Sequence, residues 1–478
     1  MTSTRTETDS LGSRTLPSAA LYGIATLRGK ENFDISFQKL GGVPELVTAL
    51  AQIKHAAAAA NRDIGILSAE IAEAIIAASM EVTKGFHADQ FIIDMLEGSG
   101  GTSINMNVNE VIANRALEIL GDQPGRYERI HPNDHVNLGQ STNDIVPTAV
   151  KLAVYKTSRA LIDSLSSLAM SLEDRSSCFD DVLRVGRTCL QAAQPMRLGQ
   201  AFGGYAAAIC RQIASLTAAR GEMLSLPLGG TAIGTGLGST SGYRSAVYRH
   251  LADIVGVDLR PAENMFDAMQ NADSFARISS EIRICAEVVG KIASDLVILS
   301  SGPNSGIGEL RLPSVQAGSS IMPGKVNPVL PMMMQQVAVA VIGNDTAVSL
   351  AALNGQLEIN HFEPIIVSRL LDSIGILAKS TRIFAERCIA GIEADQDQSL
   401  KNLMHSPALA TAFVPKLGYA KISELVHAAQ DQQRPFIEVA IQQGLIAHGE
   451  VLVALRESSD YREDDARFGI LQTNITRG

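Results

Sequence analysis

The sequence has no tryptophan, and aromatic residues make up only 4% of its 478 residues. Hydrophobic residues still account for 46%, so the core must be built mainly from aliphatic side chains and alanine. Charged residues are scarce as well, at 19%. This composition is typical of a well-packed globular protein and argues against a disordered chain. The low charge fraction also favours a surface partly covered by other subunits.

Positive charge is not in excess: the net charge is −10 and the isoelectric point about 5.5. No basic stripe interleaved with aromatic residues occurs, which argues against a nucleic-acid partner. No apolar run stands out as long enough to cross a membrane, and the N-terminal residues lack a hydrophobic secretory segment. We therefore expect a cytoplasmic, soluble protein with no membrane partner.

Cysteine is rare, and its pattern is not that of a disulfide framework or a metal site. The five cysteines are odd in number and form neither CxxC nor a cysteine–histidine cluster; they are Cys178, Cys189, Cys210, Cys285 and Cys388. Structural disulfides and a zinc site are therefore not expected. The phosphate-binding pattern GxxxxGK[ST] and the hydrolase pattern GxSxG are missing too. The Gly-rich residues 229–242 have no βαβ pattern around them, which favours a linking loop over a nucleotide site.

Long helices are what the sequence does contain. Apolar residues recur at helical spacing in several segments, among them Leu161, Leu165, Leu168, Leu172, Ile278, Ile282, Cys285, Val289, Ile366, Leu370 and Ile374. Five long helices in the middle of the chain predict a bundle. We expect three domains: residues 1–145, a central bundle of 146–399, and a small helical domain of 400–478. The first 17 residues are polar, and we expect them to be mobile.

Four polar loops interrupt this helical pattern: GSGGTSINMN, QSTND, GRTCLQ and GSSIMPGKVNP. All four present hydroxyls and amides, and two of them also carry a cation. The residues concerned are Ser99, Thr102, Ser103, Asn105, Ser141, Thr142, Asn143, Arg187, Thr188, Gln191, Ser319, Ser320, Lys325 and Asn327. Any one such cluster is more often a turn or a helix cap than a site. Four together indicate a receptor for small carboxylates.

These four loops, in this order, resemble those of the aspartase/fumarase superfamily, and residues 318–328 are similar to its signature loop. The resemblance implies an all-α, three-domain fold whose long helices form a twenty-helix core in a homotetramer. It implies that each active site is shared by three chains and uses no metal or organic cofactor. The implied reaction is a reversible anti-elimination from a succinyl compound that releases fumarate.

The resemblance also implies roles for individual residues. Ser319 would be the catalytic base, acting as an alkoxide, while Lys325 and Asn327 would bind a substrate carboxylate. The remaining site residues would bind the carboxylates and the leaving group: Thr102, Ser141, Thr142, Asn143, Thr188 and Cys189. Such a base needs backbone N–H groups to stabilise it, and the dianionic intermediate needs preorganised donors and a cation. The Gly and Pro residues of the signature loop predict a mobile lid over the substrate.

The choice of leaving group rests on finer features. QSTND, KVNPVLP and TLRGKENF are similar to aspartases, whereas GGTAIGTG, SGIGE and His131 are similar to fumarases; the balance favours elimination of ammonia from L-aspartate. Four departures from the family pattern are Cys189, Met332, Asn304 and GLGS at 236–239. Because Cys189 and Met332 replace a His–Glu pair of fumarases, water activation is disfavoured. A substituted aspartate, fumarate hydration and a catalytically inactive homologue remain alternatives, and Cys189 is a packing residue or a reactive thiol.

Overall fold

A computed structural model describes residues 3–302, 304–447, 449–451 and 453–454, and this part of the chain is mostly helical. It divides into two compact units, each assembled from three stretches of sequence. Unit 1 comprises residues 1–165, 211–289 and 336–381, and unit 2 comprises 166–210, 290–335 and 382–478. The three consecutive domains expected from the sequence stay a prediction, and residues 455–478 of the third lie outside the described residues.

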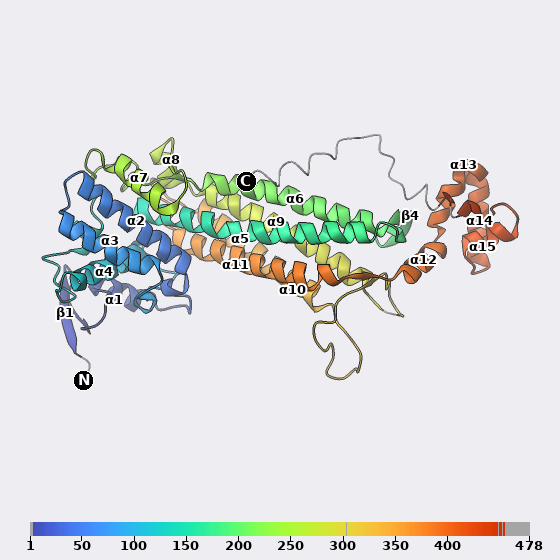
Figure 1. The fold of residues 1–478 in the computed structure, drawn as a ribbon, viewed down its shortest axis with the longest axis horizontal. Coiled ribbons are helices and arrows are strands. Elements are labelled where there is room, and N and C mark those ends of the chain that lie inside the picture. Colours follow the sequence, from blue (N-terminus) through green and yellow to red (C-terminus); the bar gives the residue numbers. More distant parts are fainter. Residues whose placement is uncertain (1–2, 303, 448, 452, 455–478) are drawn as a thin grey trace. The chain divides into compact units, whose positions relative to one another are not determined.

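The predicted long helices are present, and five of them in the described part of the chain contribute to both units (Figure 1). They are α5 (Thr142–Cys178), α6 (Leu198–Glu222), α9 (Asp273–Leu299), α10 (Val329–Leu353) and α11 (Glu363–Arg387). The leucines at positions 161, 165, 168 and 172 of α5 are all fully buried, as their helical spacing predicted. Within unit 1, Asp345 of α10 accepts hydrogen bonds from Ser279 and Arg283 of α9, at 2.6 and 2.9 Å.

The expectation about membrane-spanning segments is wrong for α10. By length and composition alone this helix could cross a membrane, with a mean hydropathy of 1.4 over its most apolar window and 28% of that window buried. The run is easily missed because Gln335, Gln336, Asn344 and Asp345 interrupt it.

The N-terminal part of unit 1 contains four helices, the last of which, α4, begins within the first polar loop (Figure 1). These are α1 (Ile24–Phe33), α2 (Pro44–Asp63), α3 (Ala69–Thr83) and α4 (Thr102–Ile119). Pro44 occupies the first position of α2, where a missing N–H costs no helical bond. The alanines of α2 are buried, because small side chains let neighbouring helices approach closely. Unit 1 also contains α7 (Tyr243–Val255) and α8 (Met265–Gln270).

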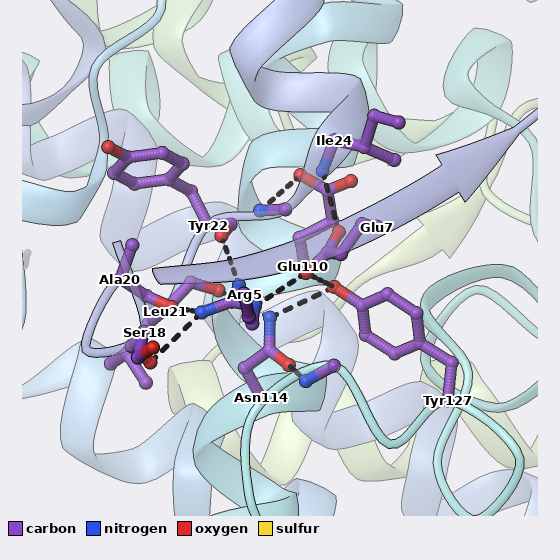
Figure 2. A network of polar contacts seen from close by, with 12 residues as sticks. Arg5, Glu7, Ser18, Ala20, Leu21, Tyr22, Ile24, Glu110, Asn114 and Tyr127 are labelled. Atoms are coloured by element: carbon purple, nitrogen blue, oxygen red, sulfur yellow. Dashed lines mark hydrogen bonds and ion pairs between the residues drawn. The ribbon is translucent and has the colours of Figure 1, made fainter. Parts of the chain in front are cut away.

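Residues 4–17 contradict the prediction of a mobile terminus, since they form a hairpin of β1 (Thr4–Asp9) and β2 (Gly12–Pro17), while residues 1–2 lie outside the described residues. Figure 2 shows the polar network that holds it. Arg5 donates to the carbonyl oxygens of Ala20 and Tyr22 at 2.6 and 2.8 Å. The buried Glu7 accepts from the Ile24 backbone N–H at 2.8 Å. These partners lie beyond the hairpin itself, so its own residue pattern did not reveal the structure.

The same network ties α1 to α4. Glu110 of α4 accepts hydrogen bonds from the backbone N–H groups of Gly23, Ala25 and Thr26, at 2.8 to 3.0 Å. Burial raises the pKa of Glu110, and these hydrogen bonds oppose that shift. A carboxylate at the start of a helix satisfies donors that have no partner within the helix. The position of α4, which begins at Thr102, is therefore tied to the N-terminal hairpin and α1.

Unit 2 contains a second hairpin that the sequence analysis missed, formed by β3 (Leu183–Thr188) and β4 (Gln191–Arg197). Its other small elements are helices α12 (Gln396–Met404), α13 (Val414–Leu417), α14 (Tyr419–Asp431) and α15 (Phe436–Gln442), and the short strands β7 (Leu310–Arg311) and β8 (Glu393–Ala394). With β5 (Ser225–Leu226) and β6 (Arg260–Pro261) of unit 1, the described residues form four two-stranded sheets. The predicted helical character is confirmed, and these small sheets are additions to it.

Candidate functional site

The first two polar loops meet in unit 1, at the N-termini of α4 and α5. Gly100 and Gly101 precede α4 with φ angles of +65° and +88°, a conformation that favours glycine. A Cβ on Gly101 would lie 2.9 Å from the Cγ2 of Val146 on α5, so the loop passes too close for any side chain. Both helix starts therefore lie side by side, and their dipoles favour an anion there, while the N–H groups of Ser103 and Asn143 donate to Ser99 Oγ and Ser141 Oγ.

Helix α4 begins at Thr102 and α5 at Thr142, although the residues before Asn109 are Gly-rich and those before Pro147 are polar, which is not typical of a helix. The start of α5 is a capping box: Ser141 N donates to Asp144 Oδ1 at 2.9 Å, and Asn143 N donates to Ser141 Oγ at 3.3 Å. Pro147 lies inside the helix. The S-x-x-D pattern was a signal for this start that the sequence analysis did not use.

Unit 1 thus brings together four of the predicted site residues. Thr102 is exposed at the first position of α4, while Ser141, Thr142 and Asn143 are half-buried at the start of α5. Asn105 of α4 donates to Thr142 Oγ1 at 3.2 Å, which links the two helix starts directly. Asn143 Nδ2 donates to the carbonyl of Ala232 at 2.8 Å, within the Gly-rich loop 229–242. That loop contains five glycines with positive φ, as predicted for a linking loop.

The third loop is the tip of the β3–β4 hairpin in unit 2. Cys189 and Leu190 form the two-residue turn with φ angles of 50° and 62°, the backbone of a tight hairpin turn. Thr188 and Cys189 are both exposed at this tip. Two-residue hairpin turns usually contain glycine or asparagine, and neither central residue here is one of these. The sequence of this turn therefore does not indicate a hairpin.

A buried ion cluster anchors this hairpin. Glu309 is fully buried; its Oε1 accepts from Arg187 at 2.8 Å, and its Oε2 lies 2.9 Å from Arg184 Nε. Asn402 of α12 also donates to Glu309 Oε1, at 3.0 Å. Burial lowers the pKa of Arg184, and the charge of Glu309 opposes that shift. Arg187, predicted from the sequence to be a polar group of the third loop, is engaged with Glu309 in holding the hairpin.

The fourth loop, residues 318–328, lies in unit 2 before α10. Ser319 Oγ accepts hydrogen bonds from the backbone N–H groups of Ile321 and Met322, at 3.2 and 2.9 Å. Asn327 Nδ2 donates to the carbonyl of Gly318 at 2.6 Å and closes the base of the loop. Lys325 is exposed. Two backbone N–H groups of the loop therefore donate to Ser319 Oγ, and donors of this kind stabilise an oxyanion.

The predicted site residues are divided between the two units. Unit 1 contains Thr102, Ser141, Thr142 and Asn143, and unit 2 contains Thr188, Cys189, Ser319, Lys325 and Asn327. Among the described residues, no hydrogen bond or ion pair joins the hairpin tip to the signature loop within unit 2. The described residues also contain no group of three His, Cys, Asp or Glu side chains that could hold a metal ion.

The two units present hydroxyls, amides, helix N-termini and one exposed lysine, which are groups suited to binding small carboxylates. Comparison with known proteins identifies the class. Residues 12–343 match the model of a lyase family. Aspartate ammonia-lyases from Bacillus sp, Pseudomonas fluorescens and Escherichia coli are 41%, 43% and 39% identical to this chain, covering 92–94% of it and 93–95% of each relative.

Solved structures agree with these relatives. A fumarate lyase/delta crystallin structure from Brucella melitensis is 44% identical, with a TM-score of 0.93, covering 96% of this chain and all of that one. A class II fumarase from Schistosoma mansoni is 34% identical, with a TM-score of 0.90 and coverage of 95% and 98%. The chain belongs to the aspartase/fumarase superfamily and is a lyase that resembles aspartate ammonia-lyases.

Proposed function

We propose that this lyase eliminates ammonia from L-aspartate, reversibly, to give fumarate. The observation that carries the proposal is the pair of backbone N–H groups, from Ile321 and Met322, that donate to Ser319 Oγ. Hydrogen bonds from N–H groups stabilise an alkoxide and lower the pKa of the hydroxyl. Ser319 can then remove a proton from carbon at neutral pH, for which an ordinary serine is too weak a base.

The proposed reaction breaks two bonds across Cα–Cβ. Ser319 Oγ takes the Cβ proton, the electron pair forms the double bond, and the amine leaves from Cα. Before the amine leaves, the neighbouring carboxylate carries a second negative charge. Lys325 supplies a cation for this charge, and Asn327 supplies the N–H that its bond to Gly318 leaves free.

The second carboxylate of the substrate is assigned to unit 1, where the starts of α4 and α5 form what we call the carboxylate half-site. Thr102, Thr142 and Asn143 stand at the starts of α4 and α5, where the helix dipoles favour a negative group. Thr188 and Cys189, at the exposed hairpin tip, are the remaining proposed site residues, and we assign them to the leaving group. Cys189 cannot act with a glutamate to activate water as histidine can, which favours an amine as the leaving group.

The first test is an assay with purified protein. Addition of L-aspartate is expected to produce fumarate, followed by its ultraviolet absorbance, while L-malate is expected to produce none above background. The Ser319→Ala variant serves as the control for contaminating enzymes. Fumarate from L-malate but not from L-aspartate would replace this proposal with a hydratase. Fumarate only from an N-substituted aspartate would identify a more specialised carbon–nitrogen lyase.

We further propose that the chain is a homotetramer in which three chains contribute to each site. Helix α10 supports this, because several apolar side chains on it are exposed in the single chain, among them Val339, Leu350 and Leu353. Exposed apolar residues concentrated on one helix mark an association surface. A site divided among chains also accounts for polar loops that each present only part of the required chemistry.

Placing a charge on this surface is expected to dissociate the assembly. The side chain of Val339 is 70% exposed. Val339→Asp is expected to lower the particle mass measured by light scattering, because the assembly dissociates. The rate of fumarate production is expected to fall as the assembly is lost. The matched control is Leu11→Asp, at an equally exposed apolar residue in the turn of the N-terminal hairpin. A Val339→Asp protein that keeps both the parent mass and the parent activity would contradict the proposal.

A further inference from the structure

A lysine that is not among the predicted site residues lies fully buried beneath the start of α5. Lys54 of α2 has no exposed surface, and its Nζ donates to Asn137 Oδ1 and to Gln140 Oε1, both at 2.9 Å. Lysine is rarely fully buried, because removing an ammonium group from water is costly. Such a group is retained where its charge or its hydrogen bonds serve a purpose.

The acceptors of Lys54 belong to the segment that leads into the QSTND loop. Asn137 Nδ2 donates to the carbonyl of Gln140 at 3.1 Å, so the two residues form a closed turn immediately before Ser141. Gln140 Nε2 in turn donates to the carbonyl of Val136 at 3.0 Å. Lys54 therefore binds both ends of the turn that precedes the carboxylate-binding residues.

Asn137 connects this turn to α4 as well. Its Oδ1 receives three donors: Lys54 Nζ at 2.9 Å and the side-chain amides of Asn105 and Asn109, both at 3.2 Å. A carbonyl oxygen has two lone pairs, so these three donors use its whole capacity to accept hydrogen bonds. Asn105 also donates to Thr142 Oγ1 at 3.2 Å. A continuous chain of hydrogen bonds thus runs from Lys54 through Asn137 and Asn105 to Thr142.

We propose that Lys54 is a positioning residue for the carboxylate half-site. It holds Asn137 and Gln140 in place. Thr142 and the starts of α4 and α5 then keep the geometry that binds a substrate carboxylate. This inference rests on the proposed function only where it takes L-aspartate as the substrate. The role of Lys54 in binding a dicarboxylate does not depend on which group leaves. Lys54 touches no reacting atom in this arrangement. It acts through Asn137, Gln140 and Asn105.

The buried charges around the turn fit this role. Asp144 is fully buried and accepts from the backbone N–H groups of Ser141, Gly229 and Thr231, at 2.9 to 3.1 Å. Burial lowers the pKa of Lys54 to about 7 and raises that of Asp144 to about 6, and each charge opposes the shift of the other. A dicarboxylate bound at the helix starts favours the charged form of Lys54. The lysine then adds a positive potential beneath the site as well as fixing its shape.

The test compares three variants of the full-length protein. Lys54→Met removes the charge and the donors while keeping the length of the side chain, and Lys54→Arg keeps a cation. Gln52→Met is the matched control, because Gln52 is half-buried on the same helix and takes part in none of the hydrogen bonds given above for Lys54, Asn137 and Gln140. Thermal midpoint and mass are measured for each. If Lys54→Met does not fold, Lys54→Gln replaces it, since glutamine retains a donor without the charge.

Two readouts separate the role of Lys54 from the choice of leaving group. Calorimetric binding of succinate, which cannot react, is expected to weaken roughly tenfold to hundredfold in Lys54→Met and to recover in part in Lys54→Arg. KM for L-aspartate is expected to rise by a similar factor, with a smaller fall in kcat. If the parent protein binds succinate but does not convert L-aspartate, the proposed function fails while the succinate series still tests Lys54. Parent-like succinate binding and KM in Lys54→Met would overturn the proposal.

Discussion

Replacing Ser319 with alanine is expected to lower kcat for fumarate formation by roughly 10²- to 10⁴-fold, the range typical of removing a general base. KM for L-aspartate should change little, because Ser319 is assigned to the Cβ proton and not to a carboxylate. Exchange of the Cβ proton with deuterated solvent should be lost in parallel. That exchange reports the base directly, whichever group leaves.

The neighbouring serine provides the control for this variant. Ser320 is exposed in the same loop, and Ser320→Ala is expected to retain kcat within about threefold, the size of an ordinary surface change of about half a kcal/mol. Because Ser319 lies in a peripheral loop, the thermal midpoint of Ser319→Ala should match that of the parent. Rapid fumarate formation or Cβ exchange in Ser319→Ala would show that another residue is the base.

The second large effect is expected at Glu309. Replacing it with glutamine leaves the buried Arg184 and the half-buried Arg187 without a counter-charge, and breaking a buried pair costs about 3–5 kcal/mol of folding stability. The denaturation midpoint should fall accordingly. Activity should fall as well, because the two arginines belong to the hairpin that places Thr188 and Cys189.

An exposed ion pair supplies the comparison. Glu287 pairs with Arg283 one helical turn away on α9, on the surface, and Glu287→Gln is expected to change stability by no more than about 0.5 kcal/mol. If Glu309→Gln proves as stable as Glu287→Gln, then the buried cluster does not hold the hairpin. The stability of the hairpin must then be assigned to β-strand pairing and packing.

Much of the helical framework could be predicted because helical periodicity is a local property. The buried leucines of α5 and the apolar face of α9 follow from spacing alone, since residues three and four apart share one face of a helix. The positions of the four polar loops followed in the same way, as breaks in that pattern. The helix starts were placed less well, because the capping box at Ser141 and the Gly-Gly turn before Thr102 depend on individual hydrogen bonds and dihedral angles.

The two hairpins could not be predicted from their own residues. β1–β2 is held by bonds from Arg5 and Glu7 to carbonyl and N–H groups beyond the hairpin, and β3–β4 is held by the pairing of Arg187 with Glu309, 122 residues away. Neither set of partners forms a recognisable local pattern. Polar segments of this kind look like loops until the structure supplies the partners.

The sequence by itself determined the helical class of the protein, the family to which its loops are similar, and the chemical character of its candidate site. These follow from local pattern and residue type. Only the tertiary structure decided that the starts of α4 and α5 lie side by side and that Lys54 is buried beneath the QSTND loop. The physical reason is that hydrogen bonds between distant residues, and the burial of a charge, depend on how the elements pack and not on the order of residues within any one of them.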